Sequence, residues 1–216
     1  MRSVVAAVAG ATGLVGSRVL RRLLDDPGTA RVIAPTRRPL PAHPKLDNPI
    51  IASGWPAPAG LDEAYGCLGT TRGDAGSADA FRAVDLDLTV AFARAAKAGG
   101  ARRFGLVSSA GANAASLFLY PRTKGEAEKA VAGLGFETCV IARPSLLLGE
   151  RARPRPAERL GEAVLGLAAP LLVGPWRKYR AISADAVAAA LIASVRGRFP
   201  GALTLESDAL QGHLVE

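Results

Sequence analysis

The stretch Gly10-Ala11-Thr12-Gly13-Leu14-Val15-Gly16 decides the fold of this chain. It follows a run of small and β-branched apolar residues, Ser3–Ala9, and leads into Leu14–Leu24, where apolar residues recur at helical spacing. Glycines at this spacing permit a tight turn, a close approach of the backbone to a pyrophosphate, and close packing of helix on sheet. The helix N-terminus adds unpaired N–H groups and partial positive charge. We therefore expect a dinucleotide site here, the alternative being a glycine turn that serves packing only.

Strands and helices alternate outward from this turn. Further strands are expected at Arg31–Thr36, near Ile50–Ala52, and at Ala64–Leu68, Phe104–Val107, Phe136–Ala142 and Leu203–Leu205. Further helices are expected around Phe81–Ala95, ending at Gly99-Gly100, over Leu119–Ala132, near Leu160–Ala169 and over Ser183–Val195. With right-handed crossovers, this alternation predicts an α/β fold, a single-domain Rossmann-type doubly wound parallel sheet. The domain covers residues 1–216, with a small substrate-side portion near 144–180.

Two proline-rich segments interrupt the alternation. Prolines recur through residues 38–60 and forbid a regular helix there, so this segment is expected to be irregular apart from its short strand. The segment Arg151–Glu158 is rich in proline and arginine and is expected to be a mobile surface loop.

The formal charge of +8 comes mostly from arginines that are spread along the chain. Because there is no run of five or six basic residues and aromatic residues are scarce, attraction of an anionic cofactor explains the charge, and we expect no nucleic-acid partner.

Cys67 and Cys139 form no CxxC pattern and are expected to be small buried residues. His43 and His213 are isolated, so no metal site is expected.

The sequence shows no membrane or targeting pattern. The N-terminal residues do not have the order of a signal peptide, and the apolar stretch Ala163–Val173 is too short to span a bilayer. We therefore expect a cytoplasmic protein with no membrane partner.

The end of the second expected strand discriminates between cofactors. Domains that select NAD usually place a carboxylate there, on the ribose 2′-hydroxyl. This chain has Thr36-Arg37-Arg38 instead, and a guanidinium suits a 2′-phosphate through charge-assisted bonds. Arg37 and Arg38 therefore favour NADP(H), the alternative being two more surface arginines in an arginine-rich protein.

A second constellation lies at the carboxyl edge of the expected sheet, where doubly wound sheets bind ligands. Ser108 and Ser109 end a strand, and eleven residues after Ser109 the pair Tyr120 and Lys124 stands four residues apart on one helical face. An ammonium group near a phenol favours the phenolate, which makes the tyrosine usable as a proton donor or acceptor. A serine hydroxyl can hold a substrate carbonyl while hydride arrives from a nicotinamide.

On these residues the chain resembles the short-chain dehydrogenase/reductase superfamily, in its atypical or extended branch. The resemblance runs through Gly10–Gly16, Val107-Ser108-Ser109-Ala110, Tyr120–Lys124 and Arg143-Pro144-Ser145, and extends to Asp85–Thr89 and Ile182–Ala188. Within that branch the chain is similar to the small Tat-interacting oxidoreductase family and its bacterial relatives. The segments that carry this closer likeness are Cys67–Gly73, Leu106–Gly111 and Phe118-Leu119-Tyr120.

The resemblance implies NADPH binding and assigns residues to it. The residues that would cradle the phosphates are Gly10, Thr12, Gly13, Leu14, Val15 and Gly16. Leu68, Gly69 and Thr70 would pass beside the cofactor, Lys124 would reach the nicotinamide ribose, and Pro144 and Ser145 would edge the nicotinamide pocket. Ser109 is the expected substrate-binding serine, with Ser108 as the near alternative.

Two departures from the superfamily pattern stand out. Asp85 occupies the helix position where many members carry a catalytic asparagine, and Ser53-Gly54-Trp55 lacks an aspartate that many relatives use near the adenine. The sequence therefore supports two hypotheses. The first is an NADP-dependent oxidoreductase of a small carbonyl or alcohol that uses Ser109, Tyr120 and Lys124; the second is a non-catalytic dinucleotide-binding module that regulates a protein partner. A homodimer is possible in either case, because the helices have apolar faces.

Overall fold

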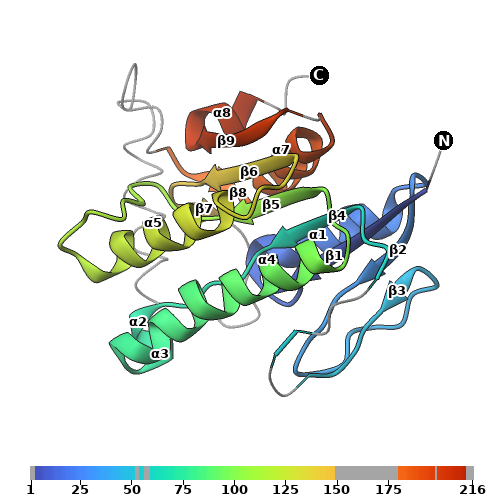
Figure 1. Cartoon of the computed structure of the whole chain (residues 1–216), viewed down its shortest axis with the longest axis horizontal. Coiled ribbons are helices and arrows are strands. Elements are labelled where there is room, and N and C mark those ends of the chain that lie inside the picture. The colour runs from blue at the N-terminus through green and yellow to red at the C-terminus, as the bar shows by residue number, and fades with distance from the viewer. Residues whose placement is uncertain (1–2, 52–53, 56–58, 149–179, 198, 213–216) are drawn as a thin grey trace.

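The structure, a computed structural model, describes residues 3–51, 54–55, 59–148, 180–197 and 199–212. Within these residues, seven parallel strands form one sheet in the order β3-β2-β1-β4-β5-β6-β9 (Figure 1). The strands are β1 (Val4–Ala9), β2 (Thr29–Ile33), β3 (Leu46–Asp47), β4 (Glu63–Gly66), β5 (Arg103–Val107), β6 (Thr138–Arg143) and β9 (Gly201–Glu206). A short parallel pair, β7 (Leu147–Leu148) and β8 (Ile182–Ser183), forms a second sheet. The expected Rossmann-type α/β fold is confirmed.

Helices cover both faces of this sheet. They are α1 (Leu14–Asp25), α2 (Arg72–Ala75), α3 (Ala78–Arg82), the π-helix η1 (Ala83–Leu88), α4 (Thr89–Ala98), α5 (Leu119–Ala132), α7 (Ala184–Arg196) and α8 (Ser207–Gly212). Alternating side chains of β1 supply two cores: Ala6 and Val8 pack with α1 and α7, and Ala7 and Ala9 pack with α4. The carboxyl ends of all seven strands meet at one edge, where the glycine turn and the β5–α5 loop follow.

The position of the third expected strand is wrong. That strand was expected near Ile50–Ala52, but β3 pairs with β2 through Leu46 and Asp47, and Ile50 forms only an isolated bridge with Thr36. Proline has no N–H group to give to a ladder, so Pro49 limits regular pairing to the residues before it. β2 correspondingly ends at Ile33, earlier than expected.

The helix expected around Phe81–Ala95 contains a π-helical turn, η1, between α3 and α4. A π-helical turn is rare and often accompanies a functional site. The indole Nε1 of Trp55 donates a hydrogen bond to the carbonyl oxygen of Leu88 at 3.0 Å, where the helix changes its winding. Asp85 lies in this turn and is buried, so the irregular winding carries a carboxylate into the protein.

A buried ion cluster stabilises the opposite, amino edge of the sheet. Glu63 at the start of β4 is fully buried and receives bonds from Arg103 at 3.1 Å, Arg196 at 2.9 Å and the Tyr65 hydroxyl at 3.0 Å. Arg196 also pairs with Asp26 at 2.6 Å. Burial raises the pKa of Tyr65 well above its ordinary value. Partial burial acts to raise the pKa of Asp26, but bonds from Arg196, the Gly28 N–H and the Thr29 hydroxyl outweigh it and lower that pKa to about 2.

Some expectations fall on residues outside the described ranges. These are the loop Arg151–Glu158, the helix Leu160–Ala169 and most of the substrate-side portion near 144–180. Within the described ranges, no helix is both long and apolar enough to cross a bilayer. The same ranges hold no group of three or more side chains arranged to bind a metal ion.

Candidate functional site

The glycine turn after β1 is packed too tightly for side chains at two of its three glycines. Gly10 has a φ of 76°, a conformation that L residues rarely adopt, and a Cβ there would lie 2.4 Å from the carbonyl oxygen of Cys67. A Cβ at Gly16 would lie 2.1 Å from the carbonyl oxygen of Gly10. A Cβ at Gly13 would lie 3.1 Å from that oxygen, which is tight but not impossible. The first and third glycines are therefore needed to bring α1 against the turn, and Gly13 leaves the approach to its backbone open.

The N-terminus of α1 is left without a side-chain cap. Gly13 occupies the N-cap position and has no side chain to offer. The first N–H groups of an α-helix have no partner within the helix, so those of Leu14, Val15 and Gly16 can bind an anion. Thr12 is exposed beside them, whereas the side chain of Val15 is buried in the core. The expected phosphate cradle is thus made chiefly of backbone groups.

The two arginines that favour NADP(H) are exposed after β2, at the same edge of the sheet as the glycine turn. Asn48 organises the segment that carries them. Its side-chain amide donates to the Ala34 carbonyl oxygen at 2.6 Å and to the Thr36 hydroxyl at 2.8 Å, and the Thr36 hydroxyl donates to the carbonyl oxygen of Arg38 at 2.6 Å. The side chain of Asn48 therefore takes the place of ladder bonds in this proline-rich segment. These hydrogen bonds hold the backbone of the segment that carries the exposed Arg37 and Arg38.

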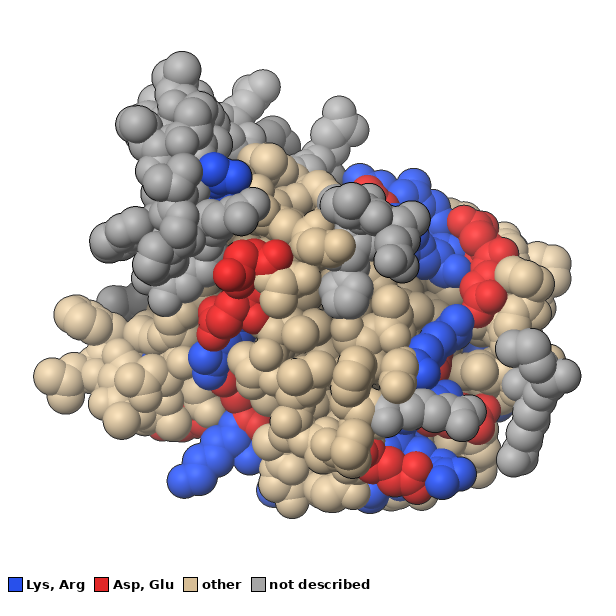
Figure 2. All heavy atoms as spheres, turned by 90° about the horizontal axis from the view of Figure 1, so that it is seen from above, with Lys and Arg blue, Asp and Glu red and all other residues tan. Residues whose placement is uncertain are grey.

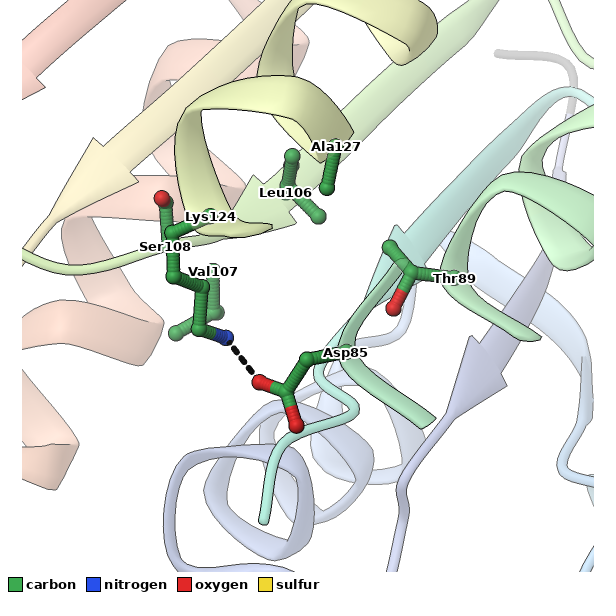
Figure 3. Close-up of a pocket in the computed structure, with 7 residues that line it drawn as sticks. All are labelled: Asp85, Thr89, Leu106, Val107, Ser108, Lys124 and Ala127. Atoms are coloured by element: carbon green, nitrogen blue, oxygen red, sulfur yellow. Dashed lines mark ion pairs between the residues drawn. The ribbon is translucent and has the colours of Figure 1, made fainter. Parts of the chain in front are cut away.

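Lys124 is held by a buried ion pair with Asp85. Its Nζ lies 2.7 Å from Asp85 Oδ1, with the lysine side chain 8% exposed and the aspartate side chain fully buried (Figure 3). Asp85 belongs to η1 and Lys124 to α5. The pair lies in a narrow crevice that has no room for a water molecule. The other residues that line this crevice are Thr89, Leu106, Val107, Ser108 and Ala127. A buried charge is costly unless it is paired, so the aspartate and the lysine each make the other's burial possible.

Asp85 also fixes the loop that follows β4. Its second carboxylate oxygen, Oδ2, accepts a hydrogen bond from the Thr70 N–H at 2.8 Å. A Cβ at Gly69 would lie 3.6 Å from Lys124 Nζ, so this loop passes directly over the ion pair. Leu68 packs partly buried against the core formed with α4 and α5. One carboxylate thus ties together the loop after β4, the π-helical turn and α5.

The serine hydroxyls at the end of β5 are buried, and neither finds a hydrogen-bond partner among the described residues. Ser108 lines the crevice beside Lys124 and Asp85. The backbone around the serines is fixed, because Ser108 N–H donates to Ala142 O at 2.8 Å and Ala110 N–H donates to Pro144 O at 2.9 Å. Unpaired buried hydroxyls are uncommon in proteins, and at a candidate site they are groups that a substrate oxygen can satisfy.

The loop between β5 and α5 is pressed against the helix at Gly125. A Cβ at Gly125 would lie 2.1 Å from the N atom of Ala114, so only glycine permits this contact. Asn113 N–H donates to Pro121 O at 2.8 Å, and the Asn113 side chain accepts from Ala115 N–H at 2.9 Å. The loop that joins the serines to Tyr120 therefore has a defined path.

Tyr120 stands at the start of α5 and is 45% exposed. Its ring stacks on the buried ring of Phe81, with centroids 5.6 Å apart and an angle of 29° between the planes. Among the described residues, no hydrogen bond joins its hydroxyl to Lys124 or to Ser109. The expected Tyr120–Lys124 pair thus occupies adjacent turns of α5, but the lysine faces the carboxylate and the tyrosine ring lies on α3.

Pro144 and Ser145 follow β6, and both form hydrogen bonds with neighbouring segments. The Ser145 hydroxyl donates to the carbonyl oxygen of Arg180, and it lies 2.9 Å from the Ser207 hydroxyl. Arg143, the residue before them, makes two bonds to the buried Glu128 of α5, at 2.9 and 2.6 Å. These bonds place the end of β6 beside the candidate site.

Charges of both signs alternate over the face seen in Figure 2, and they do not gather into one basic area. Three arginines of α1, at positions 18, 21 and 22, surround Asp185 of α7, and Arg82 pairs with Glu126 at 2.8 Å.

Cys67 lies next to the glycine turn, where burial raises the pKa of its thiol to about 12; burial raises the pKa of the Cys139 thiol to about 11. With these pKa values both thiols are protonated at neutral pH, and a protonated thiol is a poor nucleophile.

Solved structures of other proteins share the fold of this chain. MoeE5 in complex with UDP-glucuronic acid and NAD has a TM-score of 0.70 at 19% identity, and the match covers 93% of this chain and 75% of that one. A short chain dehydrogenase family protein from Francisella tularensis has a TM-score of 0.66 at 12% identity, covering 96% and 98%. The oxidoreductase ylbE from Lactococcus lactis has a TM-score of 0.65 at 17% identity, covering 98% and 97%. The chain therefore shares the Rossmann fold of these proteins.

The chain belongs to the FMP52 family. It is 41% identical over 177 residues to "Protein fmp52, mitochondrial" of Aspergillus fumigatus, covering 75% of this chain and 74% of the relative. It is 36% identical over 181 residues to "Protein FMP52, mitochondrial" of Candida albicans, covering 79% and 76%. No model of a protein family matches the sequence.

These relatives contradict the expectation of a cytoplasmic protein, because proteins that match over most of this chain are named mitochondrial. The expectation was wrong because it rested on the lack of a recognisable targeting pattern, which is weak evidence about location.

Sequence reasoning flagged Asp85 only as a departure and did not find its bond to Lys124. It also missed Asn48 and Gly125, since neither belongs to a recognised pattern. The signal that was available for Gly125 is its place one residue after Lys124, where a helix interior disfavours glycine without a packing reason.

Proposed function

We propose that this protein is an NADP(H)-dependent oxidoreductase of a small carbonyl or alcohol substrate. The observation that carries this proposal is the common position of its parts at the carboxyl edge of one parallel sheet. An uncapped helix N-terminus follows β1, unpaired serine hydroxyls follow β5, and Lys124 is held between them beside the loop after β4. This is the edge where doubly wound sheets bind ligands.

The residues present fit a dinucleotide. The backbone of Gly10–Gly16 and the N-terminus of α1 would hold the pyrophosphate. Arg37 and Arg38 would bind a 2′-phosphate, which favours NADP(H) over NAD(H). Leu68, Gly69 and Thr70 would pass beside the cofactor. The resemblance to the small Tat-interacting oxidoreductase family supports NADPH, and MoeE5, which has a similar fold, binds NAD in two solved complexes.

The bound nicotinamide would supply or accept the hydride. Ser109, with Ser108 as the alternative, would hold the substrate oxygen through a hydroxyl that has no hydrogen-bond partner among the described residues. Tyr120 would exchange a proton with that oxygen, and its exposed position leaves the hydroxyl accessible to a substrate. Lys124 has three N–H donors, so one can remain on Asp85 while others reach a ribose hydroxyl.

Asp85 changes the balance of charge in this arrangement. In a site with asparagine at this position the ammonium group would act with its full charge on the tyrosine. Here the carboxylate lies 2.7 Å from Lys124 Nζ and compensates that charge. We therefore expect slow turnover in the wild-type protein and tight orientation of Lys124.

The test is the reduction of a panel of aldehydes and ketones with NADPH, in which the reaction rate is measured from the loss of NADPH absorbance. Tyr120→Phe is expected to lower kcat by about 100-fold or more while NADPH affinity stays unchanged. Arg31→Ala, which alters an exposed side chain in the middle of β2, is the matched control and is expected to keep activity. Equal turnover by the wild type and Tyr120→Phe would refute the assigned role.

The second candidate function is a non-catalytic dinucleotide-binding module. The observation that favours it is the commitment of Lys124 to Asp85, with Tyr120 turned toward Phe81. This function predicts NADPH binding without turnover of any carbonyl, in the wild type and in Tyr120→Phe alike.

A further inference from the structure

Side-chain hydrogen bonds from Thr89 and Trp55 hold the π-helical turn η1. The Thr89 hydroxyl donates to the carbonyl oxygen of Val84 at 3.2 Å, while the Thr89 N–H donates to Leu86 O. The Trp55 indole donates to Leu88 O at 3.0 Å. Val84 lies five residues before Thr89, so its carbonyl is the acceptor that π winding offers to the Thr89 N–H. The hydroxyl therefore takes the place of a π-type backbone bond where η1 gives way to α4.

Packing fixes both of these donors. Thr89 is 2% exposed and lines the crevice that holds Asp85 and Lys124 (Figure 3). Trp55 is half-buried, and its ring meets the buried ring of Phe92 edge-on, with centroids 5.0 Å apart and 64° between the planes. An indole N–H that packs against a core usually finds a partner, so its bond to η1 also sets the orientation of the ring. The turn is thus held from α4 and from the segment between β3 and β4.

The turn carries Asp85, and the two oxygens of this carboxylate hold different elements. Oδ1 lies 2.7 Å from Lys124 Nζ on α5, and Oδ2 accepts the Thr70 N–H of the loop after β4 at 2.8 Å. Bonds of a π turn span five residues instead of four, so a change to α winding would rotate Asp85 relative to α4. A displacement of about 0.8 Å would take the Thr70 contact out of hydrogen-bonding range. The winding of η1 therefore decides whether one carboxylate reaches both partners.

We propose that Trp55 and Thr89 are positioning residues of the site. They hold η1 in its π winding and so place Asp85, which in turn places Lys124 and the loop after β4. This inference rests on the proposed function, in which Lys124 and that loop face the cofactor. The competing explanation is that both bonds only satisfy buried polar groups and add to the stability of the fold.

The Thr70 amide reports the position of Asp85 directly, because its N–H donates to the carboxylate. The experiment measures amide hydrogen exchange by NMR on the full chain without cofactor. Thr89→Val keeps the shape of the side chain and removes the hydroxyl, and Trp55→Phe keeps a ring against Phe92 and removes the N–H. Each variant is expected to raise the exchange rate of the Thr70 amide by about fivefold, the equivalent of one lost hydrogen bond. The amides of β6 are expected to keep their rates.

Two further variants separate positioning from stability. Thr89→Ser restores the hydroxyl and is expected to return the Thr70 exchange rate to within about twofold of the wild-type rate. The matched control is Thr138→Val, which changes a buried threonine at the start of β6, at the amino edge of the sheet, and is expected to leave the Thr70 amide unchanged. Equal acceleration of Thr70 and of the β6 amides in Thr89→Val would show a loss of global stability and would overturn the inference. So would a Thr70 amide that exchanges in the wild type as fast as in an unfolded peptide.

The effect on the reaction is read against Asp85→Asn, which keeps an oxygen for the Thr70 N–H and removes the charge. If Thr89 acts through Asp85, Thr89→Val lowers kcat with NADPH by about fivefold in the wild type and by less than about twofold in Asp85→Asn. Equal factors in the two backgrounds would mean independent action, which overturns the inference and leaves the oxidoreductase function standing. If the wild type reduces no aldehyde or ketone, the oxidoreductase function fails, and the Thr70 exchange rates decide whether Trp55 and Thr89 place Asp85.

Discussion

Replacing the two members of the Asp85–Lys124 pair singly and together tests whether they act as one unit. Asp85→Leu leaves a buried ammonium group without a partner, and Lys124→Met leaves a buried carboxylate. Removing one partner of a buried ion pair typically costs about 3–5 kcal/mol. For a chain of this size, that loss corresponds to a fall in Tm of about 6–20 °C.

The double variant replaces both charges by apolar groups of similar volume. Such a replacement is often neutral, because the cost of burying the two charges disappears with them. The double variant is therefore expected to be more stable than either single variant, which requires a coupling free energy larger than each single loss of about 3–5 kcal/mol. The assay is chemical denaturation of all four proteins, with the unfolding transition followed by circular dichroism.

The exposed pair Arg102–Glu137 provides the matched control, since its atoms lie 2.6 Å apart but its side chains are 67% and 58% exposed. A double-variant cycle there is expected to give at most about 1 kcal/mol of coupling. If the single losses at Asp85 and Lys124 add up in the double variant, or if the exposed pair couples as strongly, the reasoning about the buried pair is refuted.

Three further predictions concern other parts of the molecule. Gly16→Ala is expected to destabilise the fold by about 1–3 kcal/mol or more, because its Cβ would lie 2.1 Å from the carbonyl oxygen of Gly10. Gly13→Ala is expected to fold but to bind NADPH more weakly. Equal denaturation midpoints for the two variants would contradict this prediction. The pKa of Asp26 is lowered from 3.8 to about 2, so its ionised form stabilises the fold above pH 4 and this stability is lost between about pH 4 and pH 2. Asp26→Asn should flatten the change in Tm over that range, and an unchanged slope would count against the Arg196 contact. The thiols of Cys67 and Cys139 have pKa values raised to about 12 and 11, so they should react slowly with iodoacetamide at pH 8 in the folded protein and faster after unfolding. Rapid labelling of the folded protein would contradict the raised pKa values.

The fold was predictable because its signals are local. The glycine turn lies between an apolar strand and an amphipathic helix, and the alternation of β1 between two cores follows from the pleat alone. The third strand was not predictable in position, because Asn48 replaces ladder bonds through its side chain in a segment where prolines remove backbone donors.

The candidate site was predictable as a set of residues and not as a set of contacts. The spacing of Tyr120 and Lys124 places both on one side of α5, but it does not say that the lysine turns to Asp85. That contact depends on the π-helical turn, in which no residue of Ala83–Leu88 signals the change of winding. Gly125 likewise owes its role to a loop that approaches it from elsewhere in the fold.

Calorimetric titration with NADPH and with NADH tests the central claim most directly. The wild type is expected to bind NADPH more tightly than NADH, and Arg37→Ala and Arg38→Ala should weaken NADPH binding about tenfold or more toward the NADH value. Arg31→Ala removes an exposed arginine from β2, away from its carboxyl end, and should leave both affinities unchanged. If neither dinucleotide binds the wild-type protein, the glycine turn serves packing alone and the account of this site is wrong.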